Sequence, residues 1–395
     1  MKSARLRILA LVTDAFGGYG GMAKFNRDLL EGLSADSDVS EVVAVPRLIP
    51  NDYDRLPEKL TYVTEAIGGK VRYVRSVLRI VREKGPFDLI ICGHINLVPL
   101  ASVCRRLANA HLCLIIHGID AWEPGNYLTN RLVKRIDSFV SVSALTRDRF
   151  LAWTGIDRAK AHLLPNCVDI SDFGPGPKPP YLVERYGLTG KKVVMTFGRL
   201  DSREQLKGFD QILEALPELA REVPDIAYLI VGDGDDRKRL ERKAKKLGVT
   251  PQTVFAGMIS EKEKADHYRL ADVYAMPSRG EGFGIVLLEA MASGVPVIAS
   301  AADGSREALL DGKLGLLVDP GDKNQLKAAI IGSLQTARKG IIDGLGHYSR
   351  EAFRERLHSI IAGLTAVHTP ERIAKHPVSP MQPIRKTGDN VRTDY

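Results

Sequence analysis

Two carboxylates eight residues apart, Glu281 and Glu289, are the first candidates for chemistry in this chain. Between them lies the glycine frame Gly282-Phe283-Gly284, and an apolar run of helical character follows. Glycines let a backbone approach a ligand closely, and the free amides at a helix start bind anions. An offset of eight residues is a little over two helical turns, so both carboxylates would face one side if the helix began near Glu281. The set suits a ligand with a diphosphate and many hydroxyls; the alternative is a loop with two solvated glutamates.

Two cations, Arg199 and Lys207, follow a predicted strand at residues 192–197. A departing diphosphate gathers negative charge, and fixed cations stabilise that charge most in the transition state. Arginine holds phosphate in a bidentate manner and lysine acts as a point charge. No metal ion is then required, so the triplet Asp233-Gly234-Asp235 is expected to form a turn. Ordinary surface cations are the alternative interpretation.

These motifs have further partners along the chain: Pro165-Asn166-Cys167-Val168-Asp169, Phe197-Gly198-Arg199-Leu200, Lys207-Gly208 and Val231-Gly232-Asp233-Gly234. Together with Glu281 and Glu289, which match an E-x7-E signature, they resemble the retaining glycosyltransferases of family 4 over about residues 5–365. The spacing from Arg199 to Lys207 is slightly longer than is usual in that family. The resemblance implies the GT-B fold and transfer of a hexose from a UDP- or GDP-hexose donor to a glycan or lipid-linked acceptor in polysaccharide or glycolipid assembly, with no separate cofactor.

The resemblance also implies roles for individual residues. The expected catalytic residues are Arg199, Lys207, Glu281 and His117. The expected donor-binding residues are Gly18, Gly20, Gly282, Phe283, Gly284 and Glu289. Asp120 is the candidate for orienting the acceptor hydroxyl, and no residue is assigned to a metal. A histidine such as His117, at a strand end, is otherwise more often structural.

The glycine loop near residue 20 allows a second class of function. Gly18-x-Gly20-x-x-Ala23 matches a dinucleotide fingerprint between a strand and a helix. An NADP-dependent oxidoreductase therefore remains an alternative, with Arg47 placed to accept a 2′-phosphate. No acid ends the second predicted strand, as an NAD site would require. A nucleotide-sugar-binding protein without transfer activity is another alternative, against which the four residues Arg199, Lys207, Glu281 and Glu289 argue together.

Alternating strand and helix patterns predict two doubly wound, Rossmann-like α/β domains. We expect the first at residues 1–173, a Pro/Gly linker at 174–180, the second at 181–348, and a helix at 349–365 that crosses back to the first. The two domains should face each other across a cleft, with ligands at the carboxyl ends of their strands. Residues 366–395 have the composition of a disordered tail.

The 395 residues carry a formal net charge of +8, which favours an anionic partner. The range 70–84 predicts a helix with six cations and the apolar residues Val71, Val74, Leu78 and Val81, as in helices that lie on anionic membranes; a solvated helix face is the alternative. No nucleic-acid-binding motif accompanies it. Four cysteines without a C-x-x-C pair, no signal-peptide pattern and no long apolar run indicate a cytoplasmic protein, with peripheral attachment to the inner face of the membrane as the open question.

Overall fold

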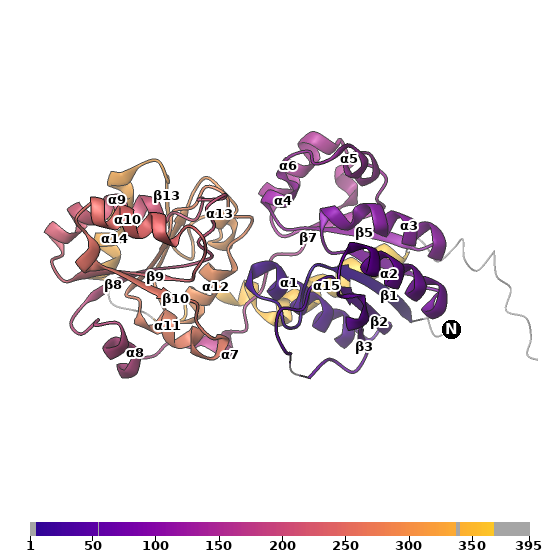
Figure 1. Ribbon diagram of the computed structural model, residues 1–395, viewed down its shortest axis with the longest axis horizontal. Helices are drawn as coiled ribbons and strands as arrows, with labels where there is room; N and C mark the ends of the chain where they lie inside the picture. Colours follow the sequence, from indigo (N-terminus) through magenta and orange to yellow (C-terminus); the bar gives the residue numbers. More distant parts are fainter. Residues whose placement is uncertain (1–4, 54, 337–339, 367–395) are drawn as a thin grey trace, which may run out of the picture.

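The computed structural model describes residues 5–53, 55–336 and 340–366, which form two α/β lobes side by side (Figure 1). The first lobe holds a seven-stranded parallel sheet in the order β3-β2-β1-β4-β5-β6-β7. Its strands are β1 (Leu6–Val12), β2 (Val39–Pro46), β3 (Leu60–Tyr62), β4 (Leu89–Cys92), β5 (His111–Ile116), β6 (Ser138–Ser141) and β7 (Ala161–Leu163). Its helices are α1 (Gly20–Ala35), α2 (Lys70–Lys84), α3 (Val98–Ala108), α4 (Ile119–Trp122), α5 (Tyr127–Val133) and α6 (Ala144–Thr154).

The second lobe repeats this architecture with a six-stranded parallel sheet in the order β10-β9-β8-β11-β12-β13. Its strands are β8 (Lys192–Phe197), β9 (Ile226–Val231), β10 (Thr253–Gly257), β11 (Val273–Met276), β12 (Val297–Ser300) and β13 (Leu316–Val318). Its helices are α8 (Pro180–Arg185), α9 (Phe209–Glu222), α10 (Arg237–Lys246), α11 (Lys264–Leu270), α12 (Ile285–Ala292), α13 (Ser305–Ala308) and α14 (Lys323–Gln335). The short helix α7 (Ile170–Phe173) lies on the connection between the lobes.

The central strands are apolar runs because both faces of a parallel sheet are covered. Ile8 to Val12 in β1 and Ile226 to Val231 in β9 are almost completely buried. Helices end where the sequence predicts: Gly294 has φ +71° and follows α12, the left-handed conformation that glycine favours at a helix end. The strand ends therefore deliver their loops, and the candidate residues on them, to the region between the lobes.

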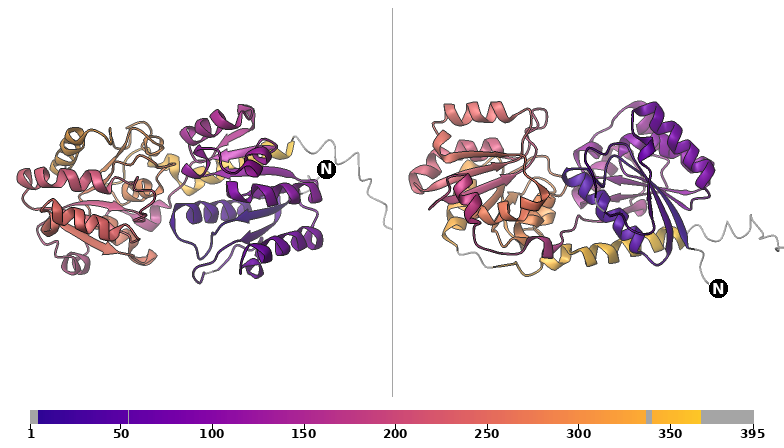
Figure 2. Two further views of the ribbon diagram at one scale, coloured as in Figure 1. Left: turned by 45° about the horizontal axis from the view of Figure 1, so that its top comes forward. Right: turned by 60° about the horizontal axis from the view of Figure 1, so that its bottom comes forward.

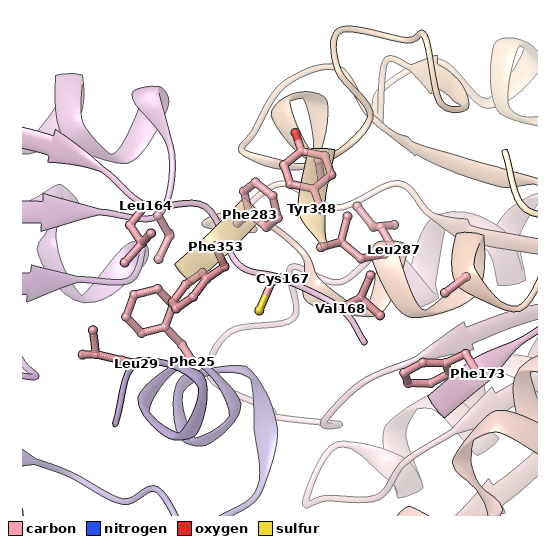
Figure 3. Packing of buried hydrophobic residues seen from close by; sticks show 14 of the residues in the cluster. Phe25, Leu29, Leu164, Cys167, Val168, Phe173, Phe283, Leu287, Tyr348 and Phe353 are labelled. Carbon is pink, nitrogen blue, oxygen red and sulfur yellow. The ribbon is translucent and has the colours of Figure 1, made fainter. Parts of the chain in front are cut away.

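The last helix, α15 (Arg350–Ala366), runs back from the second lobe along the first, as predicted (Figure 2). Its Phe353 packs edge-to-face on Phe25 of α1, with ring centroids 5.9 Å apart. Figure 3 shows this contact within one buried apolar cluster that takes residues from both lobes, including Phe283 and Leu287 of the second. The two-lobed GT-B architecture expected from the sequence is confirmed.

The structure tests the predicted helix at 70–84, but not the predicted tail. α2 spans the predicted range 70–84, but the apolar set was partly wrong: Val81 lies in the core with Tyr73, Val77 and Ile80, because these share the inner face. Val71 and Val74 are exposed, and Leu78 is half-buried. The predicted tail lies outside the described residues beyond Ala366.

Candidate active site

The two lobes touch backbone to backbone at the centre of the candidate site. The first lobe contributes His117 and Gly118, which follow β5, and the second contributes Gly282, which precedes α12. A Cβ at Gly282 would lie 2.1 Å from the carbonyl oxygen of His117, and one at Gly118 would lie 2.9 Å from the Cα of Gly282. Gly118 also has φ +152°, which side-chain-bearing residues rarely adopt. Glycine at both positions is therefore what allows this contact.

Lys207 and Glu281 form a close ion pair beside that contact. Burial by itself would lower the pKa of Lys207, but the carboxylates of Glu281, Glu204 and Asp303 together raise it above its ordinary value. The ammonium is therefore charged at neutral pH. The slightly long spacing from Arg199 does not remove Lys207 from the site, because the loop between them folds outward as a turn.

Asp303 holds the backbone that carries Glu281. Its Oδ2 accepts hydrogen bonds from the Glu281 amide at 2.9 Å and from the Ser278 hydroxyl at 2.7 Å. The next residue, Gly304, donates its amide to the Glu281 carbonyl at 2.9 Å. Burial raises the pKa of Asp303, whereas these hydrogen bonds act in the opposite direction. Both the backbone amide and the backbone carbonyl of Glu281 are thus held by hydrogen bonds.

Glu289 points elsewhere. α12 begins at Ile285, as the apolar run predicted, with Gly284 as its N-cap at φ +94°. Glu281 therefore lies outside the helix, and the condition for one shared helical face is not met. Glu289 is 1% exposed, and its two oxygens accept from Lys264 at 2.6 Å and from the Tyr268 hydroxyl at 2.7 Å. Each glutamate therefore forms an ion pair with a different lysine: Glu281 with Lys207 and Glu289 with Lys264.

Arg199 is the predicted site residue that the structure turns toward solvent. Its side chain is 64% exposed and pairs with Asp201 at 3.2 Å and Glu204 at 3.3 Å. Both partners lie in the same loop, so Arg199 is held locally at the edge of the site. It does not join the Lys207–Glu281 pair.

His117 is held as a neutral imidazole. Its Nε2 lies 3.0 Å from the Gly93 carbonyl oxygen and its ring packs edge-to-face on Phe25. Burial lowers the pKa of His117 to about 4. A carbonyl oxygen only accepts, so Nε2 carries the proton and Nδ1 keeps its lone pair. His117 is thereby set to accept a hydrogen bond, and proton donation at neutral pH is unfavourable.

Asp120 is the second residue of α4, three residues after His117. Its Oδ2 is buried and has no hydrogen-bond partner among the residues that the structure describes. Burial raises the pKa of Asp120 to about 7. A carboxyl that is half-protonated at neutral pH can donate to or accept from a hydroxyl, which keeps Asp120 as the candidate for orienting an acceptor.

Asp120 should make the stability of the protein fall as pH rises. The folded state keeps its proton up to about pH 7, whereas the unfolded state releases it near pH 4, so folding loses free energy across that window. We expect Asp120→Asn to gain stability over the wild type between pH 5 and pH 8, by about 1–3 kcal/mol at pH 8. Thermal melting at four pH values measures this, with exposed Asp343→Asn as the control. A pH-independent difference between wild type and Asp120→Asn would contradict it.

Two helix N-termini converge on the same region. α1 begins at Gly20, which has φ +86°, and a Cβ at Gly21 would lie 3.6 Å from the side chain of Ile285 at the start of α12. Gly18 packs against Asp14, where a Cβ would lie 2.7 Å from Oδ2. Phe283 is buried against Tyr348, at 5.4 Å between ring centroids, so only its backbone can serve a ligand. Amides from both lobes thus favour an anion between them.

The family models place these residues in a known lineage. Residues 19–172 match the model for Glycosyltransferase Family 4, and residues 183–339 match the model for Glycosyl transferases group 1. A phosphatidyl-myo-inositol mannosyltransferase of Mycobacterium leprae is 30% identical over 78% of this chain and 78% of its own. The chain belongs to glycosyltransferase family 4. Membership of this family removes the basis for the oxidoreductase alternative.

Other relatives of this family 4 chain are similar in kind. A GDP-mannose-dependent alpha-(1-6)-phosphatidylinositol monomannoside mannosyltransferase of Mycolicibacterium smegmatis is 38% identical over 62% of this chain, and the match spans 66% of that protein, just under two thirds. Among solved structures, Anabaena HepE in complex with UDP and glucose has a TM-score of 0.69 at 21% identity, covering 92% of this chain and 100% of that one. Sucrose-phosphate synthase from Thermosynechococcus elongatus has a TM-score of 0.73 at 22% identity with the same coverage. These two structures share the fold.

Sequence reasoning missed several members of the site. Lys264 and Tyr268 are four residues apart on α11, a spacing that puts both on one helical face. Asp303 follows β12 at its carboxyl end, the position at which open sheets present functional side chains. The spacing of Lys264 and Tyr268 and the position of Asp303 can both be found in the sequence. Neither of them predicts which glutamate these side chains bind.

Proposed function

We propose that this protein transfers a hexose from a nucleotide-sugar donor to a lipid-linked acceptor in glycolipid assembly, with retention of anomeric configuration. The observation that carries the proposal is the Lys207–Glu281 pair, set where the backbones of the two lobes touch and beside the start of α12. GDP-mannose and a phosphatidylinositol-based acceptor are the first choices, because the named relatives use a GDP-mannose donor or a phosphatidyl-myo-inositol acceptor.

Each residue has a distinct part in this reaction. The amides at the start of α12 and the ammonium of Lys207 bind the diphosphate, and Lys207 stabilises the charge that grows on it as the glycosidic bond breaks. Glu281 and the Nδ1 of His117 accept hydrogen bonds from sugar hydroxyls. Asp120 orients the acceptor hydroxyl. Arg199 lies at the edge and reaches the diphosphate only by exchanging its pairs with Asp201 and Glu204.

A transfer assay tests the proposal directly. The protein is incubated with GDP-[¹⁴C]mannose or UDP-[¹⁴C]glucose and vesicles containing phosphatidylinositol, and the lipid fraction is counted. Labelled lipid with an α-anomeric linkage, from an α-linked donor, is the expected product. Tight nucleotide binding without product from any donor and acceptor would favour the alternative of a binding protein without transfer activity.

Loss of Glu289 should weaken nucleotide binding. Glu289→Ala leaves the ammonium of Lys264 without its close partner and removes one of the residues expected to bind the donor. We expect the affinity for GDP or UDP to fall by about 1–3 kcal/mol, the usual cost of an unpaired buried polar group. Isothermal calorimetry measures it. Glu261→Ala is a matched control, because Glu261 faces the same lysine from the surface at 3.8 Å; equal affinities for wild type and Glu289→Ala would rule the assignment out.

We further propose that α2 rests on an anionic membrane surface. Its outer face combines the exposed Val71 and Val74 with arginines, and a hollow there is lined by three of them with one acid: Arg75, Leu78, Arg79, Arg82 and Glu83. Cations near an anionic surface each contribute about 1 kcal/mol, which salt screens. In the described ranges 5–53, 55–336 and 340–366, no helix is both long and apolar enough to span a bilayer. Attachment from one side is what such a helix favours.

Vesicle co-sedimentation should distinguish α2 from general basicity. We expect the wild type to pellet with phosphatidylglycerol vesicles at low salt and much less at high salt, and a variant with Arg72, Arg75, Arg79 and Arg82 changed to Gln to lose most of that binding. The control removes four exposed cations from α10 in the second lobe, Lys238, Arg242, Lys245 and Lys246. Equal pelleting of wild type and the α2 variant would show that this helix is not the anchor, and no pelleting at all would favour a soluble acceptor.

A further inference from the structure

Glu307 joins the two lobes at a point that the proposed chemistry does not use. It lies on α13 of the second lobe, and its carboxylate accepts hydrogen bonds from two backbone amides of the first lobe: Ala144 at 2.7 Å and Leu145 at 2.8 Å. These are the first two residues of α6, an eleven-residue helix whose N-cap is Ser143. A carboxylate at a helix N-terminus meets unpaired amides and the positive end of the helix dipole. Both oxygens are used, one on each amide.

On the second lobe, Glu307 belongs to the segment that fixes the Glu281 loop. Within five residues, Asp303 and Gly304 bind the amide and carbonyl of Glu281, and Glu307 then reaches the first lobe. The backbone carbonyl of Glu307 in turn accepts from the Tyr348 hydroxyl at 2.5 Å, two residues before the crossing-back helix α15 begins. The carboxylate of Glu307 therefore projects from a segment that is anchored by hydrogen bonds of Asp303, Gly304 and its own carbonyl.

On the first lobe, α6 is tied to the helix that carries Asp120. The Trp122 indole of α4 donates to the Thr146 hydroxyl at 3.1 Å, and the Trp153 indole of α6 donates to the Ala121 carbonyl at 2.9 Å. α4 follows directly on His117 and Gly118. Hydrogen bonds and the short chain segments between them thus connect the Glu281 loop through Glu307 and α6 to the loop of His117.

We infer that Glu307 is a positioning residue that clasps the lobes together in the closed arrangement and so sets His117 and Asp120 opposite Glu281. The inference rests on the proposed transfer reaction for its effect on rate, but the clasp itself is a statement about the geometry of the lobes. When the clasp is broken, the lobes retain their individual folds and the nucleotide site of the second lobe, while the acceptor side moves away.

Two variants break the clasp from opposite sides. Glu307→Gln keeps the shape of the side chain, but its amide nitrogen cannot accept the second bond. Ala144→Pro removes one donor from the first helical position, where proline is well tolerated and where the extended Ser143, at φ −152° and ψ 157°, suits a following proline. Glu241→Gln is the control, because it makes the same change of charge on the second lobe at a residue that pairs with Arg237 of the same helix, α10.

The experiment measures lobe separation and turnover independently. Dyes are placed on cysteines introduced at the exposed Arg131 and Lys313 of the full chain, whose four native cysteines are buried and so remain unlabelled. We expect both variants to shift the single-molecule energy-transfer distribution toward open states, to lower kcat for transfer at least tenfold, and to leave the GDP dissociation constant within twofold. The double variant should be no worse than the more affected single variant, because both remove the same contact.

The outcomes separate this inference from the proposed function. Distance distributions of both variants equal to wild type would overturn the clasp whether or not transfer is observed. A shift to open states with kcat unchanged would overturn the positioning role. If no donor gives product with the wild type, the proposed function fails, and the distance measurement alone decides the clasp.

Discussion

Replacing Lys207 with alanine is expected to lower kcat at least 100-fold while the fold is retained. The ammonium is the charge closest to Glu281 at the contact between the lobes, and neighbouring carboxylates keep it protonated. Loss of one charge partner of a developing anion costs on the order of 10²–10³ in rate. Steady-state transfer assays measure kcat and KM, and circular dichroism checks the fold.

Lys262→Ala is the matched control for Lys207, since Lys262 is exposed in the same lobe. A kcat of Lys207→Ala within threefold of wild type would refute the role. The same assay in excess EDTA tests whether the protein's own cations stabilise the diphosphate without a metal ion. We expect activity to persist. Complete loss that Mg²⁺ or Mn²⁺ restores would reassign the diphosphate to a metal held by Asp233 and Asp235, which here bind Arg237 and Ser202 within turns.

Gly282→Ala should be as damaging as removal of the lysine, although it deletes no functional group. The new methyl would lie 2.1 Å from the His117 carbonyl, so the loops of the two lobes must separate by about 1 Å or more. A misplacement of that size costs about 10²-fold in rate, and we expect kcat/KM to fall accordingly. Nucleotide affinity should change little, because the variant leaves Glu289 and the start of α12 in place.

Gly332→Ala provides the control for this variant. Gly332 lies within α14, where a Cβ meets nothing within 4 Å, so alanine should be neutral or slightly stabilising. Transfer kinetics of the two variants are compared side by side. Wild-type kcat/KM for Gly282→Ala would show that the close backbone contact is not needed for turnover.

Much of the fold could be predicted from the sequence because parallel sheets impose strong patterns. Continuous apolar runs predicted the central strands, Gly294 predicted the end of α12, and the range 70–84 predicted α2. The loops after the strands then had to meet between the lobes. The resemblance to glycosyltransferase family 4 named His117, Lys207 and Glu281 as site residues, and the structure places the loops that carry them in contact.

Side-chain partners were harder to predict because they depend on helix starts and loop paths. The apolar run after Gly284 predicted the start of α12 at Ile285, but it did not predict the path of the glycine loop that carries Glu281. The loop after Arg199 contains two acids that turn the guanidinium outward. On α2, the predicted stripe included Val81, because a helix with apolar residues on both faces does not reveal which face meets the core.

The crossing-back helix has a consequence for how the chain is made. α15 covers Phe25 and Leu29 of α1, so the apolar face of the first lobe is complete only when the end of the described chain is present. The first lobe leaves the ribosome first, yet its final helix follows its last strand by nearly 200 residues. At about 5–20 residues per second, the apolar face of α1 therefore stays uncovered for roughly 10–40 s after β7 has been synthesised. The lobe that is translated first is therefore finished last.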